Sequence, residues 1–165
     1  MLQLNWLAVI LSGLIPMVVG AIWYGPLFGK MWQREAGISD ETIKGANMSI
    51  IYGVSTLFAI LFAAGVMPYV IHQFHIGSSL MNQGVMDDGS DAKLFAADYL
   101  MKYGNEFRSF GHGALHGFMM GLFVLIPALG TNALFERKSW KYILINGGYW
   151  TISAALVGGT ICAFA

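Results

Sequence analysis

Charged residues are scarce in this chain of 165 residues, because Lys, Arg, Asp and Glu together make up only 11% of it. A water-soluble domain carries about 25% charged residues, and 56% of this chain is hydrophobic. Much of the protein surface must therefore face lipid. The nine bases balance the nine acids, so no excess of positive charge indicates a nucleic-acid partner.

Cysteine is also nearly absent. The single Cys162 excludes a disulfide within the chain and any zinc site built from several cysteines of one chain. The chain also lacks HExxH, a phosphate-binding glycine loop followed by Lys-Ser/Thr, and Gly-x-Ser-x-Gly. Because no catalytic signature is present, we expect a non-enzymatic protein.

Four long apolar runs are present instead, at about residues 4–24, 48–76, 112–135 and 142–164. Each run is long enough to cross a bilayer as a helix. We therefore expect residues 1–165 to form a single membrane domain, an all-α four-helix transmembrane bundle. A cleaved signal peptide is the alternative for the first run. Signal peptides begin with basic residues, however, and the first basic residue here is Lys30.

The connection between the second and third helices is long, and we expect residues 77–108 to form an extracytoplasmic insertion. Within it, residues 91–103 show a mixed helical pattern with a broad apolar face. Such a helix would either lie on the membrane surface or pack on its own protein.

Basic residues in the short loops predict the orientation of the bundle. The loop after the first helix carries Lys30, Arg34 and Lys44, and the loop before the last helix carries three bases within residues 137–141. Both loops should face the cytoplasm, which places both termini and the insertion outside. We expect a multi-pass protein of the cell inner membrane, in contact with the lipid bilayer.

The chain has 21 glycines, and three of them repeat at intervals of four residues in the third apolar run. These are Gly113, Gly117 and Gly121. The spacing places them on one helix face, where small residues let helix backbones approach closely, within the chain or between chains. The alternative is a smooth wall beside a ligand or a pore.

Four histidines should lie at the same, outer face of the membrane: His72, His75, His112 and His116. The last two are one helical turn apart and point the same way. Neutral imidazole binds Zn, Cu, Fe and Ni, so the group could hold a transition metal or a haem, or serve a proton or quinone site. Asp87, Asp88 and Asp91 could add oxygen ligands. The alternative is a set of interfacial histidines satisfied by water and carbonyl groups.

A polar cluster is expected at the cytoplasmic end of the last two helices: Asn132, Glu136, Arg137 and Asn146. Asn132 and Asn146 would hydrogen-bond across the two helices, because an unpaired amide in lipid is costly. Glu136 would pair with Arg137 or with a base of the first loop. The cluster would either hold the helices together or form a functional pocket.

Two segments, NWLAV…WYGPLFGKMW and TNALFERKSWKYILINGGYW, together resemble the bacterial membrane family called "domain of unknown function 1761". The likeness covers about residues 4–46 and 111–165, and leaves out 77–108. It implies a four-helix integral membrane protein and brings no activity. The family's signature positions would be Trp23, Tyr24, Gly25, Pro26, Asn132, Glu136, Arg137, Asn146 and Tyr149.

Three functions remain open on this sequence. The leading hypothesis is a non-enzymatic accessory or assembly subunit of a membrane complex, oligomeric through its glycine faces. The main rival is a metal-, haem- or quinone-linked redox protein that uses the four histidines. A small oligomeric transporter ranks third, because the central turns of all four helices are almost wholly apolar.

Overall fold

The computed structural model describes residues 4–165 of the chain; residues 1–3, part of the predicted membrane domain, lie outside the described residues. The helical elements that span or flank the first two apolar runs are α1 (Trp6–Ser12), α2 (Ile15–Ile22), η1 (Trp23–Leu27), α3 (Gly29–Ala36), α4 (Asp40–Gly45) and α5 (Met48–Val70). The remaining elements are α6 (Phe74–Ser79), η2 (Met81–Gln83), α7 (Asp91–Tyr103), α8 (Phe110–Met120), η3 (Gly121–Leu125), α9 (Ile126–Phe135) and α10 (Trp140–Phe164).

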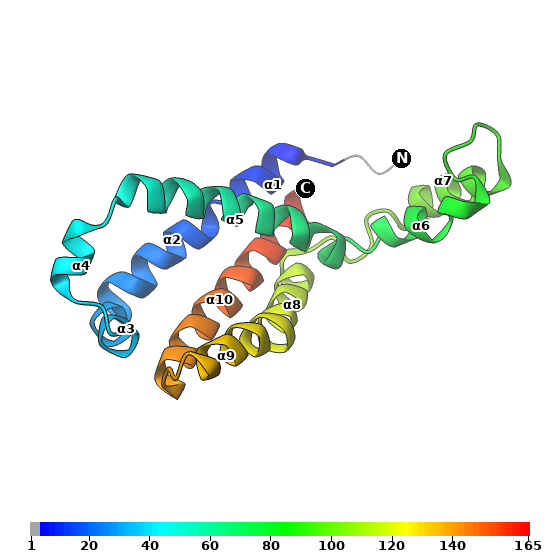
Figure 1. The fold of residues 1–165 in the computed structure, drawn as a ribbon. Helices are drawn as coiled ribbons and strands as arrows, with labels where there is room; N and C mark the ends of the chain where they lie inside the picture. The colour runs from blue at the N-terminus through cyan, green and yellow to red at the C-terminus, as the bar shows by residue number, and fades with distance from the viewer. Residues whose placement is uncertain (1–3) are drawn as a thin grey trace.

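Within the described residues all regular secondary structure is helical, with no strand. Four stretches in this part of the chain are long and apolar enough to cross a membrane: Trp6–Leu27, Met48–Val70, Phe110–Phe135 and Trp140–Phe164. The predicted all-α fold with four candidate transmembrane helices is therefore confirmed (Figure 1). The first and third of these stretches each contain a π-helical turn, η1 and η3.

α10 forms the core of the bundle, in contact with α2, α5, α8 and α9. Half of its most apolar stretch is buried (50%), compared with 22%, 22% and 17% for the other three long helices. A core cluster of buried apolar side chains joins Val157 and Ile161 of α10 to Val66 and Val70 of α5. The other three long helices thus present most of their surface to the surroundings.

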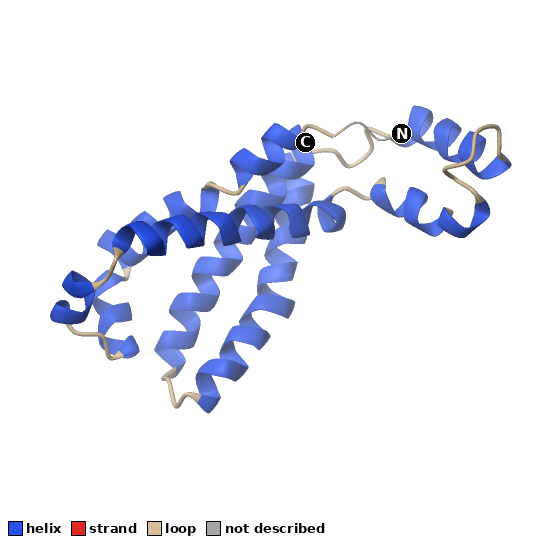
Figure 2. Cartoon of the chain, turned by 45° about the horizontal axis from the view of Figure 1, so that its top comes forward, coloured by secondary structure: helices blue, strands red, loops and turns tan. Residues whose placement is uncertain are grey.

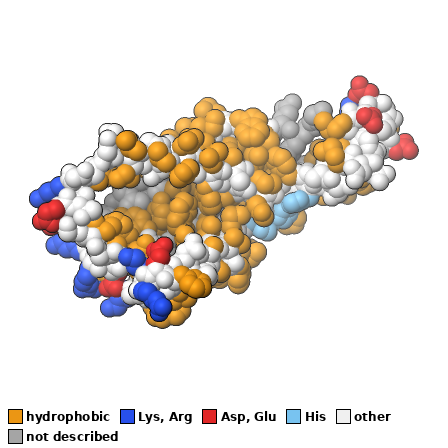
Figure 3. All heavy atoms as spheres, in the orientation of Figure 1, with side chains coloured by type: hydrophobic (Ala, Val, Ile, Leu, Met, Phe, Trp, Pro, Cys, Tyr) orange, Lys and Arg blue, Asp and Glu red, His pale blue; other side chains and the backbone are white. Residues whose placement is uncertain are grey.

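The exposed surface of the bundle carries large apolar side chains (Figure 3). Phe58 and Leu61 of α5 and Phe123 of η3 expose 62%, 59% and 69% of their surfaces. Water would oppose this exposure, because contiguous apolar surface in a soluble monomer is limited to a few hundred Å². A lipid environment accounts for it.

The seam between α8 and α10 is made of glycine on the α8 side. A Cβ atom added to Gly113 would overlap the carbonyl oxygen of Gly158, and one added to Gly117 would overlap that of Ala154. Gly121 lies equally close to the backbone of α10. The face that carries the three glycines is therefore occupied by α10 of the same chain.

Charge is divided between the two ends of the molecule. Lys and Arg side chains gather at the end formed by α3, α4 and the turn between α9 and α10 (Figures 1 and 3). The opposite end holds the start of α1, the end of α10 and the connection from α5 to α8, whose tip carries acidic side chains (Figure 3). The two predicted basic loops thus share one end of the bundle.

α5 ends six residues earlier than its apolar pattern predicts, at Val70 instead of residue 76. Pro68 removes one N–H from the helix ladder without ending it, because the Ile71 amide still donates to the carbonyl oxygen of Met67 (3.0 Å). The helix ends where Ile71 turns to an extended conformation with its side chain fully buried. Gln73 then donates hydrogen bonds to the carbonyl oxygens of Tyr103 (3.3 Å) and Glu106 (2.9 Å). These tertiary contacts override the local apolar pattern. Residues 71–109 then leave the bundle as a separate arm (Figure 2).

We expect Gly117→Ala to destabilise the protein by about 1–3 kcal/mol, because its methyl group would force α8 away from the α10 backbone. Gly111→Ala, on the same helix, is the matched control, since a Cβ there meets nothing within 4 Å. The measurement is the free energy of unfolding of solubilised protein in a denaturing-detergent titration. Equal stabilities of the two variants would contradict the close approach of the helices.

Candidate functional site

Three of the four histidines meet where α5 ends and α8 begins. His72 lies in the turn after α5, and His112 and His116 lie one turn apart on α8. The Nε2 atom of His72 is 3.3 Å from Nε2 of His112 and 3.3 Å from Nε2 of His116. One nitrogen from each ring lies within 4.8 Å of the other two. Three imidazoles from two separate segments therefore lie side by side, and we call His72, His112 and His116 the histidine group.

The edge of the histidine group is covered by Phe107. Its ring centroid is 5.1 Å from that of His112 and 6.2 Å from that of His72. The Phe107 backbone has a φ of 60°, a left-handed conformation that is costly for an aromatic residue. Surrounding contacts hold it there, because its carbonyl oxygen accepts hydrogen bonds from the Ser109 amide (2.9 Å) and the Cys162 thiol (3.2 Å).

Arg108 fixes this corner to the end of α10. Its Nε donates to the carbonyl oxygen of Cys162 (2.8 Å), and its Nη2 donates to that of Ala165. The carbonyl groups at a helix C-terminus carry partial negative charge, which favours a cation there. Phe107 and the start of α8 are thus anchored directly to the central helix.

The histidine group is partly open to solvent, with His72 exposed and His112 and His116 half-buried. Partial burial holds the pKa of His72 below its ordinary value, and the neighbouring His112 and His75 side chains have a smaller effect in the same direction. A lowered histidine pKa means that the neutral form dominates at pH 7. Neutral imidazole is the form that binds metal ions, because one of its ring nitrogens has a free lone pair.

The fourth histidine and the acidic residues lie elsewhere. His75 is exposed on α6, and the structure places it outside the group formed by the other three. Asp88 pairs with Lys93 on the arm. No carboxylate of residues 4–165 belongs to the histidine group. Of the predicted set of four histidines with possible oxygen ligands, the structure therefore brings three histidines together.

The polar residues at the basic end do not form one cluster. Asn146 is half-buried: its Oδ1 accepts a hydrogen bond from the Tyr24 hydroxyl (2.8 Å), and its Nδ2 donates to the carbonyl oxygen of Tyr142 (2.8 Å). Asn132 is exposed, as are Glu136 and the adjacent Arg137. The helix-to-helix partner of Asn146 is thus Tyr24 of η1, in place of the predicted Asn132.

The acid that joins the two basic loops is Glu35. The Ser139 hydroxyl donates to its Oε2 (2.5 Å), and Arg34 lies 3.3 Å from its Oε1. The hydrogen bond from Ser139 lowers the pKa of Glu35, and the hydrogen bond from Arg34 contributes a smaller lowering. Within residues 4–165 no ion pair involves Glu136. The structure therefore assigns to Glu35 the pairing role that the sequence suggested for Glu136.

Sequence reasoning missed Phe107, which lies against the histidines, and Arg108, which anchors this corner to α10. Nothing in the local pattern could have indicated them, since an aromatic residue has no preference for positive φ. Tyr24 was among the signature positions of the resembling family, but its pairing with Asn146 depends on how η1 and α10 pack.

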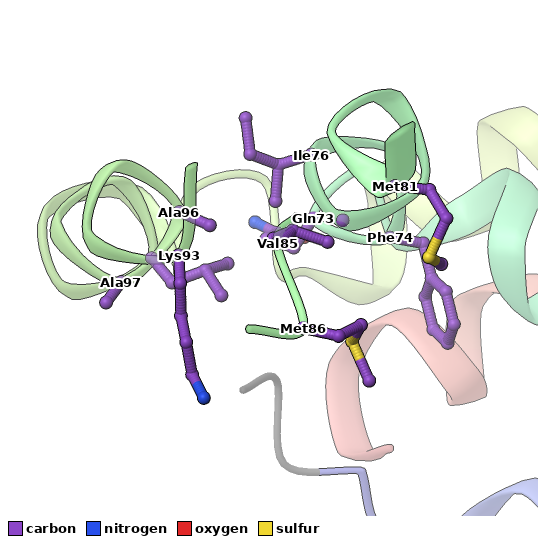
Figure 4. Close-up of a pocket in the computed structure, with 11 residues that line it drawn as sticks. Gln73, Phe74, Ile76, Met81, Val85, Met86, Lys93, Ala96 and Ala97 are labelled. Carbon is purple, nitrogen blue, oxygen red and sulfur yellow. The ribbon is translucent and has the colours of Figure 1, made fainter. Parts of the chain in front are cut away.

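A cavity of about 290 Å³ lies in the arm, between α6, η2 and α7 (Figure 4). Its lining is mostly apolar and includes Phe74, Met86 and Leu100. Gln73 and Lys93 are the polar members, and the Lys93 amino group points away from the other labelled side chains (Figure 4). The cavity could take a small apolar group, but it presents no convergent set of ligands.

The fold and the histidine group together define a class: a helical protein with four helices that could span a membrane and one clustered set of imidazoles. The family model described as "Protein of unknown function (DUF1761)" matches residues 7–162, and the chain belongs to this family. The resemblance is confirmed, and the matched range also includes residues 77–108, which the resemblance left out. No curated protein and no solved structure matches the chain.

We expect Asn146→Ala to lower the free energy of unfolding by about 1 kcal/mol, because the Tyr24 hydroxyl would lose its acceptor in an apolar setting. Asn132→Ala is the control, since that side chain is exposed, and it should leave the stability unchanged or raise it. Both are measured by denaturing-detergent titration. A larger loss for Asn132→Ala than for Asn146→Ala would contradict this assignment.

Proposed function

We propose that the protein binds one transition-metal ion through His72, His112 and His116. The observation that carries the proposal is the convergence of their Nε2 atoms, with His72 at 3.3 Å from each of the other two. Two nitrogens bound to one tetrahedral zinc ion at its usual bond length lie about 3.3–3.4 Å apart. The nitrogen pairs of His72 with His112 and with His116 therefore already have the spacing expected around a shared ion, and the third pair lies within 4.8 Å.

A single ion fits this arrangement better than a haem does. A haem iron takes its axial ligands from opposite faces of a wide planar ring, whereas the three nitrogens all lie within 4.8 Å of one another. The partial exposure of the group also supplies an entry path, which a metal site requires.

We expect purified protein to bind about one equivalent of Zn(II) or copper, and His112→Ala to lose most of it, because two imidazoles hold an ion far less firmly than three. His75→Ala is the matched control, since His75 is an exposed histidine outside the group, and it should bind like the wild type. Metal content after equilibrium dialysis is the measurement. Equal binding by both variants would rule out the proposed site.

The orientation belongs to the same proposal. The basic loops share one end of the bundle (Figure 3), and basic loops remain on the cytoplasmic side during insertion. The histidine group lies towards the opposite end, so it would face the outside of the cell inner membrane, together with the arm and both termini.

An accessory or assembly subunit is the second candidate function, and the surface of α5 favours it. Between Met48 and Phe58 every residue of this helix is exposed except the half-buried Thr56. Since α10 already covers the glycine seam of α8, contact with another subunit would use this part of α5. Gly53 offers a close approach there, because no atom lies within 4 Å of an added Cβ.

If a subunit packs on this part of α5, Gly53→Leu should dissociate the complex while leaving the stability of the monomer unchanged. Gly45→Leu is the control, because Gly45 is equally open but precedes the transmembrane helix. Native mass spectrometry of gently solubilised protein would report the assembly. A wild-type protein found only as a single chain would exclude this function.

A further inference from the structure

The charge of the histidine group restricts which ion it can hold. Its three ligands are neutral, and no thiolate or carboxylate of the described residues belongs to it. The nearby Cys162 thiol is fully buried, and the carbonyl oxygens of Val70 and Phe107 each lie 3.2 Å from its sulfur, so its one proton is already engaged by backbone acceptors. A bound ion would therefore keep its whole charge.

The surroundings also supply no compensating negative charge. Ligating histidines usually donate their second ring N–H to a carboxylate or a carbonyl group, and within residues 4–165 the histidine group makes no hydrogen bond to a carboxylate. Arg108, next to Phe107 in the sequence, directs its guanidinium to the carbonyl oxygens of Cys162 and Ala165. On the remaining side lies the apolar ring of Phe107.

Both effects penalise a divalent ion more than a monovalent one. The cost of taking an ion even partly out of water rises with the square of its charge, and no carboxylate of the described residues joins the group to offset that charge. Among the metals that imidazole binds well, zinc, copper, iron and nickel, copper is the one with a stable monovalent ion.

We propose that the ion held by His72, His112 and His116 is monovalent copper, Cu(I), in preference to Zn(II). This inference rests on the proposed metal-binding function and deepens it. Three nitrogens suffice for Cu(I), which accepts low coordination numbers, whereas zinc bound by three protein ligands takes a fourth from water or substrate.

The test is a pair of competition titrations on the intact, solubilised protein under anaerobic conditions. Cu(I) and Zn(II) are each titrated against a chromophoric chelator of known affinity. We expect the dissociation constant for Cu(I) to be lower by about tenfold or more. Equal or tighter binding of Zn(II) would overturn the copper assignment and leave the metal site standing. Binding of neither ion, or binding unaffected by His112→Ala, would overturn the metal site itself.

Phe107 allows the charge argument to be tested separately. Asp and Asn both tolerate the left-handed backbone found at this position, so Phe107→Asp and Phe107→Asn differ mainly by one negative charge beside the rings. We expect the affinity for Zn(II) relative to Cu(I) to be about tenfold higher in the Asp variant than in the Asn variant. An unchanged ratio in two folded variants would show that charge does not select the ion.

Discussion

The backbones of α8 and α10 lie in direct contact along the stretch from Gly113 to Gly121, and the positions of the other elements depend on that approach. Neither helix can rotate about its axis without bringing a larger side chain into the seam. The rotation of α8 directs His112 and His116 towards His72 at one end of the bundle. The rotation of α10 directs Asn146 towards η1 at the other end. One steric constraint thus determines the orientation of both polar groups.

The arm between α5 and α8 is fastened where it leaves the bundle and where it returns. Gln73 holds it at the start, through the carbonyl oxygens at the end of α7. Arg108 holds it at the end, through the last carbonyl groups of α10. The strained Phe107 lies between these two anchors and against the histidines. The imidazoles therefore sit at the junction of the arm and the bundle, where a bound ion would link them.

Composition and apolar run length were enough to predict the helical class and the four long helices, because lipid requires long uninterrupted apolar segments. The end of α5 was beyond this kind of reasoning, since Ile71 and Gln73 leave the helix to satisfy contacts with distant residues. The same applies to His75, which the early turn at Val70 places outside the histidine group. The convergence of the other three follows in part from sequence, as the spacing of His112 and His116 already aligns them on one helix face.

The central place of α10 has a consequence for biogenesis. A ribosome makes the chain from its N-terminus, so α10, which α2, α5, α8 and α9 all touch, is made after the other three long helices. Until then, the earlier helices have only limited contacts with one another, chiefly between α1 and α5. Most contacts between the long helices can therefore form only after α10 has been made.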